Sequence, residues 1–326
     1  MRVETELKAS IFDIHPLSTH DGPGIRTAFF FKGCSLKCEW CQNPESIKIQ
    51  KQVWHYSLNC LRCGICIDTC PENALERDKE KGIAIDYGLC TGCGVCTEVC
   101  PGKALKKIGE DYTLETLLKI VERDKPFMTK KIGGGVTVTG GEPLLQADFL
   151  AEFLQQCKEM GVHTAVDTCG QAPWSSFEKV LPFTDLFLFD IKIMDNGSHK
   201  ELTGSGNHTI LNNILRLADT IDERGCRTSI WIRTPLIPGA TFTKDNLSEI
   251  GTFISEDLRS RIDRWELCSF NPLPKEKYNR LDTPWKYSET PLLTEKEGED
   301  ALLWAQNSFT QPEKVFLTGM TAKEQQ

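Results

Sequence analysis

The sequence predicts an α/β protein built on a parallel sheet, with a small cysteine-rich domain inserted into it. Two observations predict this fold. Six β-branched or apolar segments alternate with segments of helical period between residues 26 and 270, a pattern typical of parallel sheets. A stretch of two similar halves, LNCLRCGICIDTCPENAL (58–75) and GLCTGCGVCTEVCPGKAL (88–105), interrupts the alternation between the first two strands.

Local patterns predict each strand and helix. Strands are expected at 26–32, 135–139, 163–168, 186–191, 228–233 and 265–270. Helices are expected at 113–124, 147–160, 208–223 and 243–258, with Thr113 as a candidate N-cap. LFLFDI (186–191) is almost continuously apolar, as in a strand covered on both faces. The proline- and charge-rich chain after residue 270 predicts a loop, a helix near 294–307 and a short strand near 314–317.

Composition excludes several classes of protein. The 326 residues, 40% of them hydrophobic, suffice for one large domain and a small one. No apolar run reaches the length of a membrane span. The start MRVETELKAS lacks the layout of a signal peptide, so a cytoplasmic protein is expected. Fifteen cysteines then indicate metal binding rather than disulfides. The net charge of −8 argues against nucleic acid as a partner.

The two similar halves each carry the spacing C-x2-C-x2-C-x3-C-P, at an offset of 30 residues. This is the spacing of bacterial ferredoxins, in which the fourth cysteine of each run binds the other iron–sulfur cluster. One cluster is then expected on Cys60, Cys63, Cys66 and Cys100. The other is expected on Cys70, Cys90, Cys93 and Cys96. Zinc is the alternative, although zinc sites usually take two C-x2-C pairs separated by a longer stretch.

A third group, Cys34, Cys38 and Cys41, follows the first strand directly, where a parallel α/β fold places functional loops. Three thiolates bind three of the four irons of a cubane-type 4Fe–4S cluster. The fourth iron is then free for another ligand. Spacing alone leaves two alternatives open, an electron-transfer cluster with a distant fourth ligand and three unrelated thiols.

These residues carry a family resemblance. The motif C-x3-C-x-aromatic-C, with Trp40 as its aromatic, resembles the radical S-adenosylmethionine (SAM) superfamily. HDGPGIRTAFFFKGCSLKCEWCQNPES (20–46) and VTGGEP (138–143) resemble the glycyl radical enzyme activating enzymes, such as pyruvate formate-lyase activating enzyme-like proteins. The two ferredoxin runs match the subgroup with an inserted two-cluster domain. The resemblance covers roughly residues 11–278 and weakens after about 270.

The resemblance implies a partial (β/α)6 radical SAM barrel over 1–51 and 108–275. It implies a ferredoxin-like α+β domain with two 4Fe–4S clusters over 52–107, and leaves 276–326 as a C-terminal extension. The implied reaction is reductive cleavage of SAM to a 5′-deoxyadenosyl radical, which abstracts a hydrogen atom from a backbone glycine of a partner enzyme. Two rival hypotheses are a radical SAM enzyme acting on a small molecule and an electron carrier without catalysis.

The resemblance also implies cofactors and partners. The cofactors are three 4Fe–4S clusters, SAM and a monovalent cation. The partners are a glycyl radical enzyme and, as electron donor, a ferredoxin or flavodoxin. The enzyme is expected to be an anaerobic monomer without nucleic-acid or membrane partners.

By resemblance, SAM is held by residues from five places in the chain. They are Trp40, Gln42, Gly140, Gly141, Glu142, Asp190, Ile191, Lys192, Arg233 and Asn271. Asn271 departs from the family, which carries His there. A candidate monovalent-cation site comprises Asp167, Thr168 and Asp190. The remaining cysteines are expected to be small buried side chains, with Cys169 nearest the site. They are Cys157, Cys169, Cys226 and Cys268.

Overall fold

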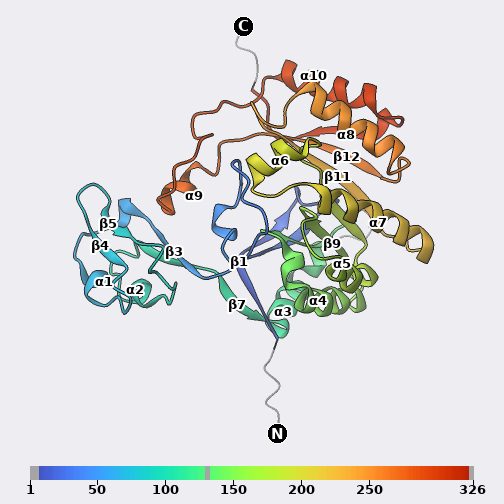
Figure 1. Ribbon diagram of the computed structural model, residues 1–326. Coiled ribbons are helices and arrows are strands. Elements are labelled where there is room, and N and C mark those ends of the chain that lie inside the picture. The colour runs from blue at the N-terminus through green and yellow to red at the C-terminus, as the bar shows by residue number, and fades with distance from the viewer. Residues whose placement is uncertain (1–6, 129–132, 323–326) are drawn as a thin grey trace.

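The computed structural model describes residues 7–128 and 133–322. The expected chain start at residues 1–6 and the last four residues of the expected C-terminal extension lie outside the described residues. Within the described residues, a nine-stranded open sheet has the order β13-β12-β11-β10-β9-β8-β2-β1-β7 (Figure 1). Its strands are β1 (Lys8–Ser18), β2 (Arg26–Phe31), β7 (Glu110–Thr113), β8 (Gly135–Gly140), β9 (His163–Thr168), β10 (Leu186–Asp190), β11 (Ser229–Leu236), β12 (Arg264–Ser269) and β13 (Val315–Thr318).

All neighbouring strands from β2 to β13 run parallel. The six predicted parallel strands are therefore confirmed, and the predicted terminal strand extends the same sheet as β13. β1 and β7 add an antiparallel edge that the sequence did not predict. β1 buries Ala9 and Ile11 but exposes most of its second half, so buried and exposed residues alternate over only part of the strand. β7 has only four residues, which are mostly polar.

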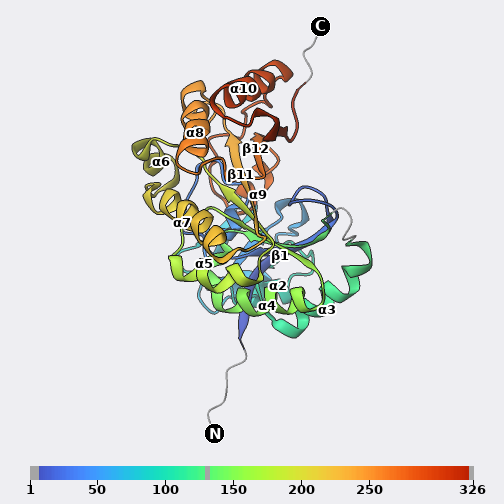
Figure 2. The same cartoon turned by 90° about the vertical axis from the view of Figure 1, so that its right-hand side faces the viewer.

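Helices cover the outer face of this sheet (Figures 1 and 2). The helices outside the inserted segment are α3 (Leu114–Asp124), α4 (Ala147–Glu159), α5 (Trp174–Val180), α6 (Asn196–Thr203), α7 (His208–Arg224), α8 (Lys244–Glu256), α9 (Lys275–Arg280) and α10 (Glu295–Ser308). The predicted cap is confirmed, because the Thr113 side chain accepts a hydrogen bond from the Thr116 amide at the start of α3. Within the described ranges, no helix is long and apolar enough to cross a membrane.

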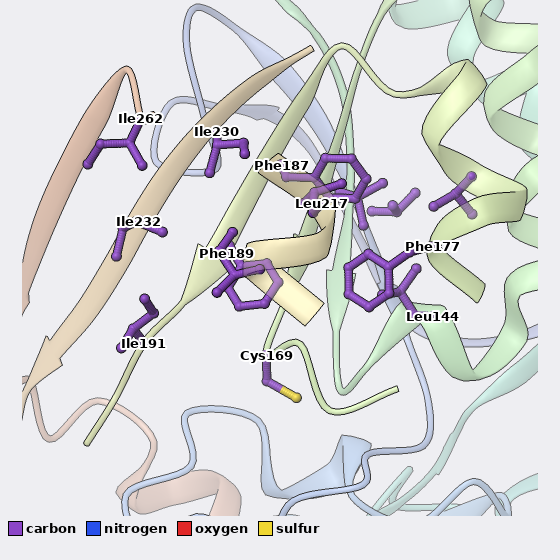
Figure 3. Close-up of a cluster of buried hydrophobic side chains, with 14 of the residues drawn as sticks. Leu144, Cys169, Phe177, Phe187, Phe189, Ile191, Leu217, Ile230, Ile232 and Ile262 are labelled. Carbon is purple, nitrogen blue, oxygen red and sulfur yellow. The ribbon is translucent and has the colours of Figure 1, made fainter. Parts of the chain in front are cut away.

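The main core lies between the helices and the sheet (Figure 3). Phe187 and Phe189 of β10 face Phe177 of α5, with ring centroids 6.1 and 6.2 Å apart. The alternate residues, Leu186 and Leu188, are also buried, in a cluster on the opposite face of the strand. The prediction that LFLFDI is covered on both faces is therefore confirmed.

The cysteine-rich segment forms a separate lobe beside the nine-stranded open sheet and its helices, which are together called the barrel below (Figure 1). Its strands pair as two antiparallel ribbons, β3 (Gln52–His55) with β6 (Leu105–Ile108) and β4 (Leu75–Asp78) with β5 (Gly82–Ile85). Its two short helices, α1 (Ile65–Asp68) and α2 (Val95–Glu98), occupy equivalent places in the two halves. Each helix follows a glycine with positive φ, Gly64 at 83° and Gly94 at 92°. A small apolar core, which includes Val53, Leu75, Ile83 and Leu105, holds the lobe together.

Candidate active site

A cavity of about 370 Å³ opens at the carboxyl ends of the parallel strands. It brings together most of the residues predicted from the sequence: Cys34, Trp40, Cys38, Cys41, Gln42, Gly140, Gly141, Asp167, Thr168, Asp190, Lys192 and Arg233 all line it. Three predicted residues, Glu142, Ile191 and Asn271, are not among its lining residues. Lining residues that the sequence analysis did not assign to the site include Asn43, Thr139, Cys169 and Cys268.

The loop from Gly33 to Ser46 places three sulfur atoms on the cavity wall. Its backbone is fixed from outside, because the Lys37 amide donates to the Thr203 carbonyl at 2.7 Å and the Glu39 amide donates to the Leu202 carbonyl at 3.1 Å. Two sulfurs accept backbone amides, Cys34 from Leu36 and Cys41 from Asn43, both at 3.4 Å. Such amide donors suit thiolate ligands, whose negative charge they stabilise.

Burial disfavours charge on these sulfurs in the absence of a positive partner. It raises the pKa of the Cys38 thiol to about 11 and moves the pKa of Cys41 upward as well. Bound metal reverses this preference, since a coordinating thiol is deprotonated. The three half-buried thiols, two of which accept amide hydrogen bonds, therefore fit a cationic metal centre.

The glycine pair packs directly on this loop. A Cβ atom on Gly141 would lie 2.1 Å from the Gly33 carbonyl oxygen, and Gly140 has a φ of +116°. Both positions therefore exclude a side chain. The Glu142 amide donates to the Gly33 carbonyl at 2.7 Å, which ties the end of β8 to the cysteine loop and leaves backbone facing the cavity.

The Glu142 carboxylate is not part of the cavity lining, and its role in SAM binding stays a prediction. It is fully buried and accepts hydrogen bonds from the Thr168 hydroxyl and from the amides of Leu144 and Cys169. Burial raises its pKa, whereas these hydrogen bonds act in the opposite direction. Glu142 thus joins the glycine loop to the end of β9, beneath the cavity floor.

Opposite charges meet on the far wall of the cavity. Asp190 pairs with Lys192, whose side chain is 10% exposed. Arg233 lies 3.4 Å from carboxylate oxygens of both Asp167 and Glu266. Burial raises the pKa of Asp167 to about 6, although Arg233 acts to lower it. Burial alone would lower the pKa of Lys192, but Asp190 and nearby thiols raise it overall, so Lys192 is a permanent cation at the cavity.

Each residue of the candidate cation site has a protein partner. Asp167 accepts the Thr139 hydroxyl at 2.7 Å and faces Arg233. Asp190 faces Lys192, and the Thr168 hydroxyl donates to Glu142. The set is close together, but its oxygen atoms are engaged within the protein.

Ile191 and Asn271 are likewise not among the residues that line the cavity. Ile191 is buried and its amide donates to the Arg233 carbonyl at 3.0 Å, which keeps β10 and β11 in register. The Asn271 side chain accepts the Leu273 amide at 3.2 Å within its own turn. The Asn271 carbonyl, rather than its side chain, reaches toward the site, where it accepts the Gln42 amide at 3.3 Å.

The four remaining cysteines divide into two pairs. Cys157 is fully buried in the core, as expected, and Cys226 is half-buried. Cys169 and Cys268 instead line the cavity. Cys169 lies at the edge of the main core (Figure 3), with its thiol in hydrogen-bonding reach of Cys34. The sequence analysis placed Cys169 nearest the site, and the same signal, a position at the end of a predicted strand, could have identified Cys268.

In the inserted lobe, two separate small cavities are each bordered by four cysteines. Cys60, Cys63, Cys66 and Cys100 line one, and Cys70, Cys90, Cys93 and Cys96 line the other. Each set combines three cysteines of one half with the last cysteine of the other half. In the described part of the chain, no three His, Cys, Asp or Glu side chains stand close enough to hold a single metal ion.

Comparisons with known proteins give consistent findings. The Radical SAM superfamily model matches residues 29–246. The chain is 40% identical over 280 residues to the (2S)-3-sulfopropanediol dehydratase activating enzyme of Klebsiella oxytoca, covering 85% of this chain and 86% of that protein. It is 38% identical over 291 residues to the trans-4-hydroxy-L-proline dehydratase activating enzyme of Clostridioides difficile, covering 89% and 93%.

A solved structure shares the fold. Streptococcus suis SuiB bound to its precursor peptide SuiA superposes with a TM-score of 0.51 at 15% identity, covering 88% of this chain and 46% of that chain.

Proposed function

Because the chain belongs to the radical SAM superfamily, and within it to the glycyl radical enzyme activating enzymes, we propose that Cys34, Cys38 and Cys41 hold its SAM-binding 4Fe–4S cluster. The chain activates a partner glycyl radical enzyme by radical SAM chemistry. The observation that supports this assignment of residues is the single cavity, which three cysteines, a glycine pair and a buried lysine line together. The expected function is thereby confirmed at the level of the family.

The chain's own residues would bind and orient SAM around that cluster. When bound to Cys34, Cys38 and Cys41, a reduced 4Fe–4S cluster would supply the electron for reductive cleavage of SAM. Lys192 offers the positive charge that a carboxylate of the methionine part requires. Gly140 and Gly141 present bare backbone, so the ligand approaches without meeting a side chain. Trp40 and Gln42 border the same cavity and are placed to contact the remainder of the ligand.

We assign the eight cysteines of the inserted lobe to two further 4Fe–4S clusters in a ferredoxin-like domain. The crossed sets of four cysteines around two cavities support this assignment. If the lobe bound zinc instead, the protein would contain zinc and fewer irons. Anaerobic reconstitution followed by iron analysis is expected to give about twelve irons per chain, and about four would leave only the cluster shared with the family.

The partner is a glycyl radical enzyme with a flexible glycine loop, and a ferredoxin or flavodoxin supplies the electrons. We propose that the enzyme works as a monomer in the cytoplasm of cells growing without oxygen. Cys63 and Cys93 are exposed at the lobe surface, where oxygen would reach clusters bound there.

The test has two stages. The reconstituted enzyme, reduced with dithionite and given SAM, is expected to form 5′-deoxyadenosine, while the Cys38→Ala variant is not. Background levels from both proteins would rule out both enzyme hypotheses and leave an electron carrier. A doublet electron paramagnetic resonance (EPR) signal on an added glycyl radical enzyme then identifies a protein substrate. Its absence with every candidate partner would favour the small-molecule alternative.

A further inference from the structure

Residues 275–287, here called the bridging segment, contact both the cysteine loop of the barrel and the inserted lobe. We propose that this segment carries electrons to the SAM-binding cluster from one of the two lobe sites, the one formed by Cys70, Cys90, Cys93 and Cys96. This site is the inner one, and the site formed by Cys60, Cys63, Cys66 and Cys100 is the outer one. The proposal rests on the function and cluster assignments above.

At one end, the bridging segment is bonded to the loop that carries Cys34, Cys38 and Cys41. The Tyr278 hydroxyl donates to the Cys41 carbonyl at 3.0 Å, and the Trp285 indole donates to the Glu39 carbonyl at 3.0 Å. The Tyr278 and Trp285 rings stack with centroids 4.9 Å apart and an interplanar angle of 9°. Trp40 belongs to the same buried cluster. The segment is therefore packed rigidly against the backbone of a cluster ligand.

At its other end, the segment is bonded to the lobe. The Tyr87 hydroxyl lies 3.1 Å from the Arg280 carbonyl and 2.8 Å from the Val53 carbonyl. The Arg280 guanidinium lies over the rings of Trp54 and Tyr56, 5.1 and 4.8 Å from their centroids. Leu281 packs in a buried cluster with Trp54. These contacts hold the lobe in one position relative to the barrel.

The two cysteine sets of the lobe differ in their distance from this junction. The inner cavity includes Val53 of β3 in its lining, whereas the outer cavity has no residue of β3. Gly92, within the Cys90–Cys96 loop, approaches the barrel connection so closely that a Cβ there would lie 2.2 Å from the Lys51 carbonyl. Figure 1 shows α2, which follows Cys93, on the barrel side of the lobe and α1 at its far end.

A path made of covalent and hydrogen bonds joins the inner set to the SAM-binding set. It runs from Cys90 three residues back to Tyr87, across the hydrogen bond to the Arg280 carbonyl, along α9 to Tyr278, and across the hydrogen bond to Cys41. Electron transfer through protein weakens exponentially with distance, and bonded paths conduct better than gaps. The outer cavity is lined by Leu61, whose side chain is exposed, and the segment contacts this half of the lobe through the ion pair of Asp282 with Lys81, which supplies no aromatic ring.

The decisive experiment counts stored electrons. The loaded enzyme is reduced with photoexcited 5-deazaflavin, the light is switched off, and SAM is added. Each electron that reaches SAM releases one methionine and one 5′-deoxyadenosyl radical, which becomes 5′-deoxyadenosine by taking a hydrogen atom from a thiol supplied in the buffer. The Cys63→Ala/Cys66→Ala variant lacks the outer site, and the Cys93→Ala/Cys96→Ala variant lacks the inner site at equivalent positions of the repeat. EPR spectra before and after SAM show which cluster has lost its electron.

We expect about three 5′-deoxyadenosine per chain from the wild type, about two without the outer site, and about one without the inner site. In the last variant the EPR signal of the outer cluster survives SAM addition. The order is overturned if the inner signal survives when the outer site is missing, or if the outer signal disappears when the inner site is missing. Failure of the proposed function looks different, because no protein then forms 5′-deoxyadenosine.

A second comparison tests the path without removing a cluster. Tyr87→Phe deletes the hydroxyl that contacts Arg280, and Tyr56→Phe is the matched control because Tyr56 contacts Arg280 through its ring. Rapid freeze-quench EPR is expected to show that the inner signal decays several-fold more slowly after SAM addition in Tyr87→Phe only. Equal decay in the two variants overturns the path.

Discussion

The Thr168 hydroxyl lies 2.9 and 2.8 Å from the two carboxylate oxygens of Glu142. This bond joins the residue after the glycine pair to the end of the neighbouring strand. It also explains why the Glu142 carboxylate does not line the cavity, because the hydroxyl of Thr168, which does line it, satisfies that carboxylate.

Glu142 is therefore expected to act on stability more than on SAM binding. Glu142→Ala leaves buried donors of Leu144, Thr168 and Cys169 without an acceptor and should lower the free energy of unfolding by about 3 kcal/mol. Glu142→Gln keeps an acceptor oxygen and should cost about 1 kcal/mol. Chemical denaturation of the cluster-loaded variants measures both values. A tenfold or larger loss of SAM affinity in Glu142→Gln, roughly 1.4 kcal/mol, would contradict this account and restore the role first expected from the sequence.

Gly141 is expected to tolerate no side chain. In Gly141→Ala the new Cβ would meet the Gly33 carbonyl at 2.1 Å, so the cysteine loop must shift, and SAM affinity should fall about 10- to 100-fold. Gly197→Ala is the control, because Gly197, like Gly141, has no positive φ, and the nearest atom to a Cβ there would be an Asp195 carboxylate oxygen at 3.4 Å. Equilibrium SAM binding and iron content are the measurements. Equal behaviour of the two variants would show that the contact with Gly33 is unimportant.

Lys277 is expected to be coupled energetically to Glu45. Its ammonium lies 2.8 Å from the Glu45 carboxylate, whose side chain is only 1% exposed. Lys277→Met strands that buried charge and should lower the free energy of unfolding by about 2 kcal/mol. Adding Glu45→Gln should restore part of the loss, giving a coupling energy of about 1 kcal/mol in a double-mutant cycle. Strict additivity would mean that the pair contributes nothing.

His163 is expected to make stability depend on pH. Burial, helped by Arg26, lowers its pKa from 6.5 to about 4. Between these values the unfolded chain binds a proton at His163 and the folded chain does not, so stability rises with pH across this window and falls as the medium becomes more acidic. Thermal unfolding of the wild type and of His163→Asn at pH 7 and pH 5 checks this. The wild type should lose more stability on acidification, and a parallel loss in both proteins would refute it.

The sequence predicted the parallel sheet well because each strand has a local pattern of its own. LFLFDI and GVTVT consist of residues that need burial, and each predicted helix carries one apolar face. β1 and β7 escaped prediction because they are held by edge pairing with β2 and with each other. Such pairing depends on a partner strand that is distant in the sequence, so the residues of an edge strand need not show a pattern of their own.

The cavity residues were predictable where a motif fixes the backbone. The C-x3-C-x2-C spacing places Cys34, Cys38 and Cys41 on one loop. The glycine pair of GGEP indicates the segment that packs against this loop. Side-chain direction was not predictable: Glu142 and Asn271 both follow strand ends, yet each turns away to satisfy nearby amides. Tyr278 was missed because its contact with Cys41 joins residues that lie 237 positions apart.

The crossed cysteines make the inserted lobe a linked system. Cys70 belongs to the first half but borders the second cavity, and Cys100 does the reverse. Neither half can complete a four-cysteine set alone, so occupation of either cavity fastens both halves together and lowers the entropy cost of occupying the other. Metal loading of the lobe should therefore be cooperative: a variant that lacks one site keeps the four cysteines of the other, but should need a higher iron and sulfide concentration to load it, and its iron content is measured before reduction.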